Sequence, residues 1–88
     1  MTLTRDKKLL ATTLRKPRTV KTLADLLDDL LTEDEILDLA ARLKIAKLIT
    51  RGLTYETIAK KLQVSTSTVT KIGHVLKYGR GALRKIIK

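Results

Sequence analysis

The stretch that decides the fold is LTYETIAKKLQVSTSTVTKIGHVLKYG, residues 53–79. Two residues in it, Thr54 and Ser65, are of the type that caps the start of a helix, because their side-chain oxygens accept hydrogen bonds from free backbone N–H groups. Gln63 and Val64 form a tight break between the two expected helices, and Gly79 is expected to end the second helix. The stretch therefore predicts two short helices joined by a tight turn.

The apolar and small residues of this stretch have the spacing of a helix-turn-helix, in which two short helices cross steeply. They are Ile58, Ala59, Leu62, Val64, Val69 and Ile72. The β-branched run over residues 64–70 has a strand propensity of its own, which leaves a strand as the alternative. Because the sequence shows no partner strand, the spacing favours two packed helices.

The outer face of the second helix is polar and is the face that would enter a major groove. Hydroxyl groups can contact bases or phosphates, and a lysine can bond guanine or a phosphate. The candidate DNA-binding residues here are Ser65, Thr66, Ser67, Thr70, Lys71 and His74, although His74 is equally well explained as a solvated helix residue. The candidates for phosphate contacts, which position rather than specify, are Arg51, Thr54, Lys60, Lys61 and Lys77.

Three further helices are expected ahead of this stretch. Leu3, Leu10 and Leu14 are at helical spacing and predict a helix over residues 3–15, with a mobile arm over residues 1–16 as the alternative, and Pro17 breaks any helix there. Leucines at helical spacing over residues 22–31 predict an amphipathic helix. Thr32 and Glu35 then form a capping box, which predicts a helix that runs to about Arg51 and ends at Gly52 in a left-handed conformation. This helix is apolar on two sides, so part of its cover is expected to come from a second subunit.

The charge is divided unevenly along these 88 residues, whose formal net charge is +10. Residues 1–21 carry +6, residues 22–41 carry −7 and residues 42–88 carry +11. A field of one sign over the C-terminal half suits the binding of nucleic-acid phosphates, whereas solvated surface lysines are the alternative explanation. One domain is expected, with four segments: a basic N-terminal arm or helix (1–21), a helical dimerisation core (22–52), a helix-turn-helix head (53–79) and a short C-terminal helix (80–88).

Several classes of function have little support in this composition. The chain has no cysteine and one histidine, which excludes disulfides and a zinc site of the usual His/Cys type. No nucleophile, base or metal constellation is recognisable, so we do not expect an enzyme. No apolar run is long enough to span a membrane, and the last segment, which could lie on a membrane surface, is expected to pack back on the domain. A cytoplasmic protein is expected.

The chain resembles the Trp repressor superfamily and is most similar to its YerC/YecD-type, Trp-repressor-like members. The resemblance covers residues 31–79 and rests on LLTEDEILDLAARLKIAKLITRGLTYETIAKKLQVSTSTVTKI and the KYG that follows. It implies an all-α fold of five to six helices with a helix-turn-helix. It also implies an intertwined homodimer whose two heads face successive major grooves of double-stranded DNA.

The same resemblance places candidate effector contacts. Thr32 and Arg42 match family positions beside the bound corepressor, L-tryptophan. Lys71 stands where the family has a second arginine and Ile72 where it has a glycine, and these two departures argue against tryptophan, because lysine lacks a planar stacking face. We therefore expect no cofactor. Gln63 also replaces a glycine that is common at the turn, which predicts mild strain.

The function expected from these observations is a sequence-specific DNA-binding transcription regulator, of the repressor kind, associated with the nucleoid. Two alternatives stay open: a non-specific architectural nucleic-acid-binding protein, and a protein-interaction module that docks through an aspartate-rich helix face.

Overall fold

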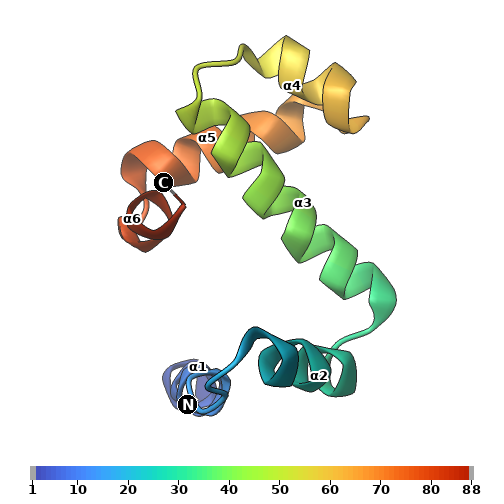
Figure 1. The fold of residues 1–88 in the computed structure, drawn as a ribbon. Helices are drawn as coiled ribbons and strands as arrows, with labels where there is room; N and C mark the ends of the chain where they lie inside the picture. Colours follow the sequence, from blue (N-terminus) through green and yellow to red (C-terminus); the bar gives the residue numbers. More distant parts are fainter. Residues whose placement is uncertain (1, 88) are drawn as a thin grey trace. The chain divides into compact units, whose positions relative to one another are not determined.

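The computed structural model describes residues 2–87, and every regular element in that range is an α-helix (Figure 1). In chain order the helices are α1 (Thr2–Leu14), α2 (Val20–Leu30), α3 (Glu33–Thr50), α4 (Tyr55–Leu62), α5 (Thr66–Tyr78) and α6 (Ala82–Ile86). The all-α prediction is confirmed, and the strand alternative for residues 64–70 is wrong. Residues 1 and 88, the ends of the first and last predicted segments, lie outside the described range.

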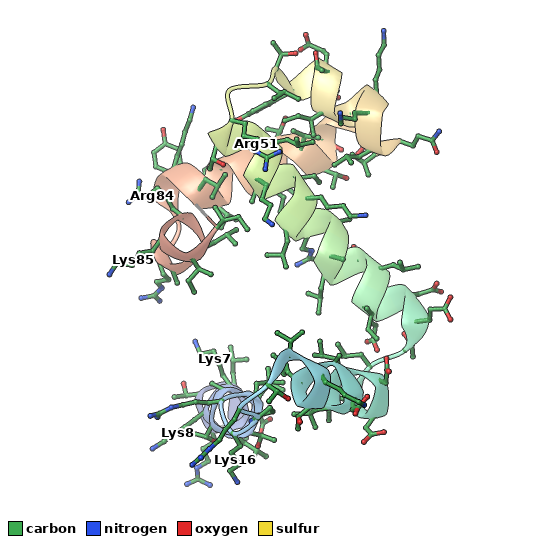
Figure 2. All side chains as sticks on the ribbon, viewed as in Figure 1. Lys7, Lys8, Lys16, Arg51, Arg84 and Lys85 are labelled. Carbon is green, nitrogen blue, oxygen red and sulfur yellow. The ribbon has the colours of Figure 1, made fainter. Side chains whose placement is uncertain are left out.

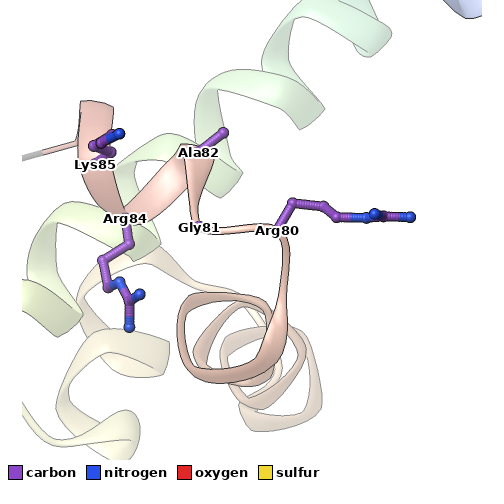
Figure 3. A pocket seen from close by; sticks show the side chains of 5 residues that line it. All are labelled: Arg80, Gly81, Ala82, Arg84 and Lys85. Carbon is purple, nitrogen blue, oxygen red and sulfur yellow. The ribbon is translucent and has the colours of Figure 1, made fainter.

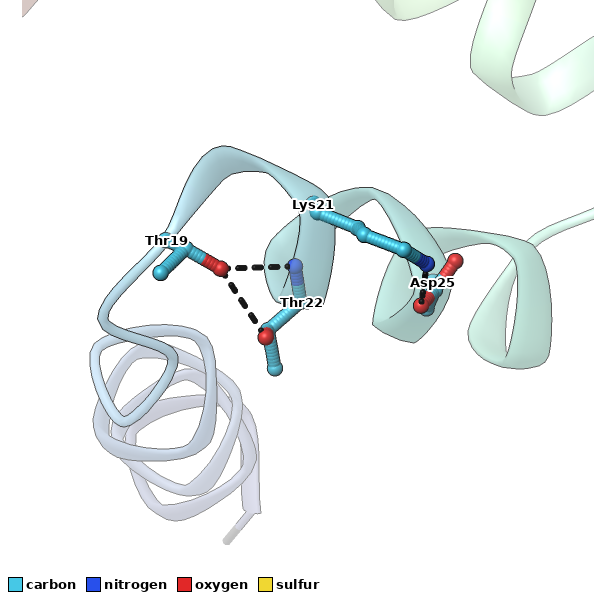
Figure 4. Close-up of polar contacts among 4 residues, drawn as sticks. All are labelled: Thr19, Lys21, Thr22 and Asp25. Carbon is cyan, nitrogen blue, oxygen red and sulfur yellow. Dashed lines mark hydrogen bonds and ion pairs between the residues drawn. The ribbon is translucent and has the colours of Figure 1, made fainter.

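The chain forms two compact units, Met1–Ile36 and Leu37–Lys88. In the first unit, α2 begins two residues before the predicted start at Thr22. The reason is a cap that the leucine pattern did not include: the backbone N–H of Thr22 donates to Thr19 Oγ1 at 3.1 Å (Figure 4). Within the same helix, Lys21 and Asp25 form an exposed ion pair at 3.0 Å. None of the described side chains in this unit is buried.

The capping box that starts α3 is confirmed. The N–H of Glu35 donates to Thr32 Oγ1 at 3.2 Å, and the N–H of Thr32 donates to Glu35 Oε1 at 2.9 Å. The helix ends at Thr50, one residue before the predicted end, and Gly52 adopts the expected left-handed conformation with φ +90°. Only glycine takes this conformation without strain, which fixes the end of α3 at this point.

The second unit contains the core. Its buried hydrophobic residues come from α3, α4 and α5 and from the segment after α6: Ile45, Ala46, Ile58, Ala59, Val69, Ile72, Leu76 and Ile87. Leu62 and Val64 are half-buried against this cluster, so all six residues proposed for the helix-turn-helix interior lie in or beside it. Helix α6 packs on α5, as expected for the last segment. Among residues 2–87 no helix is both long and apolar enough to cross a membrane.

Three residues connect α4 to α5 and produce the helix-turn-helix. Gln63 adopts the left-handed conformation, with φ 56° and ψ 48°, where the related glycine would be unstrained. Its N–H and that of Val64 both point to the carbonyl of Ala59, which closes the end of α4. The predicted end of α5 at Gly79 is confirmed: Gly79 is the C-cap residue, its backbone is extended (φ −76°, ψ −164°), and its N–H donates to Val75 O at 2.8 Å.

A close approach between Tyr55 and Gly73 sets how α4 meets α5. A Cβ atom added to Gly73 would overlap the hydroxyl and ring of Tyr55. Gly73 is buried in the middle of α5, and Tyr55 is the first residue of α4. The absence of a side chain at Gly73 thus lets the phenol ring pack directly on the backbone of α5.

Candidate nucleic-acid interface

Helix α5 presents a polar face that the rest of the second unit leaves open. Its apolar residues Val69, Ile72 and Leu76 are buried against the core, so the opposite side is held outward. That side consists of Thr66, Ser67, Thr70, Lys71 and His74, all of which are exposed. No acidic residue occurs in α5, so nothing on this face would repel a phosphate.

Both caps of the helix-turn-helix are formed by residues that the sequence also proposed for DNA contact. Thr54 Oγ1 accepts the N–H of Thr57 at 3.2 Å, and Ser65 Oγ accepts the N–H of Thr68 at 3.1 Å. These bonds fix the first turns of α4 and α5. The two side chains therefore have a structural role beside any contact they make with a phosphate.

The candidate phosphate contacts are exposed cations on three helices or just beyond them. Arg51 follows the end of α3 (Figure 2), Lys60 and Lys61 lie in the last turn of α4, and Lys77 lies in the last turn of α5. In the described part of the chain none of them has an acidic partner. Their charge is therefore available to an external anion.

A hollow of about 530 Å³ lies beside this face and brings together two of the three proposed effector residues, Arg42 and Lys71. Its lining residues are Asp38, Arg42, Thr68, Lys71, Ile72, His74 and Val75. Thr32, the third proposed effector residue, belongs to the first unit, where its hydroxyl caps α3. The Ile72 side chain is among the lining residues, so it occupies space that a glycine would leave free.

Asp38 also lines this hollow and was not among the predicted site residues. Asp38 Oδ2 and Arg42 Nη2 form an exposed ion pair at 3.2 Å, across one turn of α3. The i, i+4 spacing was a sufficient signal, because oppositely charged residues at this separation meet on a helix surface. Arg42 thus has a carboxylate partner of its own before any ligand arrives.

A second hollow, of about 510 Å³, lies at α6 and was also not predicted as a site. Its charged lining residues are Arg80, Arg84 and Lys85 (Figure 3). Figure 3 shows that the Arg80 and Arg84 side chains extend in different directions. They do not converge on a common point, so this cluster adds positive charge without forming a defined anion site.

Residues 2–87 contain no cluster of histidine, aspartate or glutamate side chains that could hold a metal ion.

The family model described as "Trp repressor protein" matches residues 5–88. The chain belongs to the Trp repressor family. Its members are DNA-binding regulators rather than enzymes. The resemblance seen in the sequence is thereby confirmed.

This chain is also similar in sequence to a curated protein, the "Uncharacterized protein YerC" of Bacillus subtilis (strain 168). It is 40% identical over 55 residues, which are 62% of this chain and 53% of the relative. The match thus spans about half the length of that protein. A comparison with solved structures gives no significant match.

Proposed function

We propose that this protein is a sequence-specific DNA-binding transcription regulator, of the repressor kind, that acts as a homodimer. The observation that carries the proposal is the exposed, acid-free outer face of α5, held outward by the buried contacts of the helix-turn-helix. Such a face enters a major groove, while flanking cations bind the phosphates. A protein with this role works at the chromosome, so we place it in the cytoplasm, associated with the nucleoid.

Exposed leucines in the first unit support the homodimer. Leu9, Leu10 and Leu30 are 67%, 51% and 49% exposed in the single chain. On α3, Leu37, Leu39 and Leu43 are also about half exposed. A helical segment that buries none of its side chains lacks the apolar contacts that offset the entropy of ordering. A second copy that covers these leucines would supply them, and would place two α5 helices about 34–36 Å apart for successive grooves.

The salt dependence of DNA binding tests the proposal. We expect the logarithm of the association constant to fall steeply with the logarithm of salt concentration, for a duplex selected from a random pool. Lys60→Ala with Lys61→Ala removes two candidate phosphate contacts from each subunit, so the slope should become shallower by about 3–4 in the dimer. The matched control is Lys21→Ala, because Lys21 already has Asp25 as its partner.

The other functions predict different results in the same titration. A steep slope without a preferred sequence would indicate the architectural nucleic-acid-binding protein. A flat slope would contradict DNA binding altogether. If partner proteins are then retained by a variant with reversed charge at Arg51, Lys60, Lys61 and Lys71, the interaction module that docks through Asp25, Asp28 and Asp29 becomes the better explanation.

We further propose that L-tryptophan is not the effector. Ile72 lines the hollow where the family has glycine, and Lys71 offers no planar face for an indole ring. Addition of L-tryptophan should therefore leave the affinity for the selected duplex unchanged. A tryptophan-dependent increase in affinity would contradict this proposal without affecting the assignment of a DNA-binding face.

A further inference from the structure

Most hydroxyl groups at the start of α5 are already hydrogen-bonded within the helix. Ser65 Oγ lies 3.0 Å from Ser67 Oγ and 2.8 Å from Thr68 Oγ1, in addition to its bond from the N–H of Thr68. Thr70 Oγ1 donates to the carbonyl oxygen of Thr66 at 2.8 Å. The Thr66 hydroxyl has no such partner among the described residues. The first two turns of α5 thus offer fewer free donors than their composition suggests.

The bond of Thr70 decides what this residue presents outward. Its hydroxyl proton is donated to the carbonyl oxygen of Thr66, so Oγ1 faces the preceding turn of the helix. The residue is exposed, and the remaining heavy-atom substituent on its Cβ is the γ-methyl group. In a threonine held this way, Oγ1 can no longer donate without breaking the internal bond and keeps only its acceptor capacity, whereas the methyl group stays available for apolar contact.

The same face has one residue of the two types that most often select guanine, and this residue is a lysine. Arginine, which bonds guanine O6 and N7 with two donors, is absent between Arg51 and Arg80. Lys71 is the one cation on the outer face of α5 ahead of its last turn, and it also lines the hollow beside Arg42. A threonine methyl group can also select a base in the major groove. It does so by apolar contact with the C5-methyl group of thymine.

We propose that Thr70 selects thymine in each half-site, through contact between its γ-methyl group and the C5-methyl group of the base. This inference rests on the proposed function, since it assumes that α5 enters the major groove. Thr66 lies one turn earlier on the same stripe of the helix and is also exposed. Thr70 is in the middle of the exposed face, so the thymine that it contacts is expected near the centre of the half-site, and this position is recognised by methyl contact.

The first test replaces thymine by deoxyuridine, which removes the C5-methyl group and leaves base pairing intact. The duplex is the sequence that the full chain selects from a random pool, with each thymine replaced in turn. At one symmetric pair of positions, we expect binding to weaken by about fourfold per half-site, and by about fifteenfold when both are replaced. The remaining thymines should tolerate the change.

Two substitutions at Thr70 separate the methyl group from the hydroxyl. Thr70→Ser keeps the hydroxyl and removes the methyl, so it should bind thymine and deoxyuridine duplexes equally. Thr70→Val keeps a methyl and removes the hydroxyl, so it should discriminate between the two duplexes as the unmodified chain does. Thr12→Ser is the matched control, because Thr12 on α1 is exposed and makes the same bond to the carbonyl four residues earlier, at 2.8 Å.

The outcomes distinguish this inference from the function on which it rests. Equal affinity for every deoxyuridine duplex, unchanged discrimination by Thr70→Ser, or loss of discrimination in Thr70→Val would each overturn methyl contact, while DNA binding by the helix-turn-helix would stand. A selection that yields no preferred duplex would overturn the proposed function and this inference together. Circular dichroism of each variant establishes that α5 is still folded.

Discussion

At the scale of single residues, the turn of the helix-turn-helix contains the clearest local strain in the chain. Gln63 is the one non-glycine residue with positive φ among residues 2–87. The left-handed conformation brings Cβ close to the following carbonyl oxygen, which costs roughly 1–2 kcal/mol for most residues. The residues on either side, Leu62 and Val64, pack against the core, and this packing holds Gln63 in the left-handed conformation.

Replacement of Gln63 by glycine should therefore stabilise the protein. Glycine removes the steric cost but adds conformational freedom to the unfolded chain, so the expected gain in the free energy of unfolding is about 0.5–1 kcal/mol. Urea denaturation measures this gain. Gln63→Ala keeps the Cβ atom and should give no comparable gain; a glycine variant less stable than the alanine variant would contradict the assignment of strain.

At the scale of helices, the contact between Tyr55 and Gly73 connects the first residue of α4 to the middle of α5. Because the phenol ring lies where a Cβ atom would be, this contact sets how closely the two helices approach. The orientation of the outer face of α5 depends on that approach. A change at this buried position should thus alter DNA binding although neither residue belongs to the exposed face.

Gly73→Ala should destabilise the protein by about 1–3 kcal/mol through overpacking, and should weaken binding to the selected duplex. If the cause is the contact with Tyr55, the cost should shrink when Tyr55→Leu is present, because the shorter side chain leaves room for the added methyl. A double-mutant cycle on unfolding free energies measures the coupling. Additive costs would mean that the two residues do not constrain each other.

The helix starts were predictable because each depends on residues at most three positions apart. Thr32, Thr54 and Ser65 all cap as expected. The start of α2 was missed because the leucine pattern begins after its cap. The hollow at Arg42 and Lys71 joins residues far apart in sequence, and the bond of Thr70 depends on a rotamer. Neither could be derived from spacing alone.

At the scale of the whole molecule, the contrast between the two units is the main feature. The second unit has a core of eight buried residues, whereas the first has none among its described residues. Leu43 lies on α3, the helix expected to need cover from a second subunit, and it is 48% exposed in the single chain. The homodimer proposed above gives these exposed leucines their partners.

Leu43→Ala should accordingly act on association. Loss of a leucine that is buried in a dimer costs about 2–5 kcal/mol, and both copies carry the change. We expect the melting temperature of the unmodified chain to rise with protein concentration, and the variant to melt lower at every concentration. Lys44→Ala, at an exposed position next along α3, is the control. Identical melting of the two variants, independent of concentration, would contradict the dimer.

The placement of the two tyrosines has an optical consequence. Tyr55 packs on Gly73, and Tyr78 lies beside His74 with the ring centroids 4.8 Å apart, so both phenols belong to the helix-turn-helix. The chain contains no tryptophan. Tyrosine emission from the intact protein therefore monitors the DNA-binding head alone, without any label. Indole fluorescence in a mixture with L-tryptophan belongs wholly to the added amino acid, which makes its anisotropy a direct, background-free assay for corepressor capture.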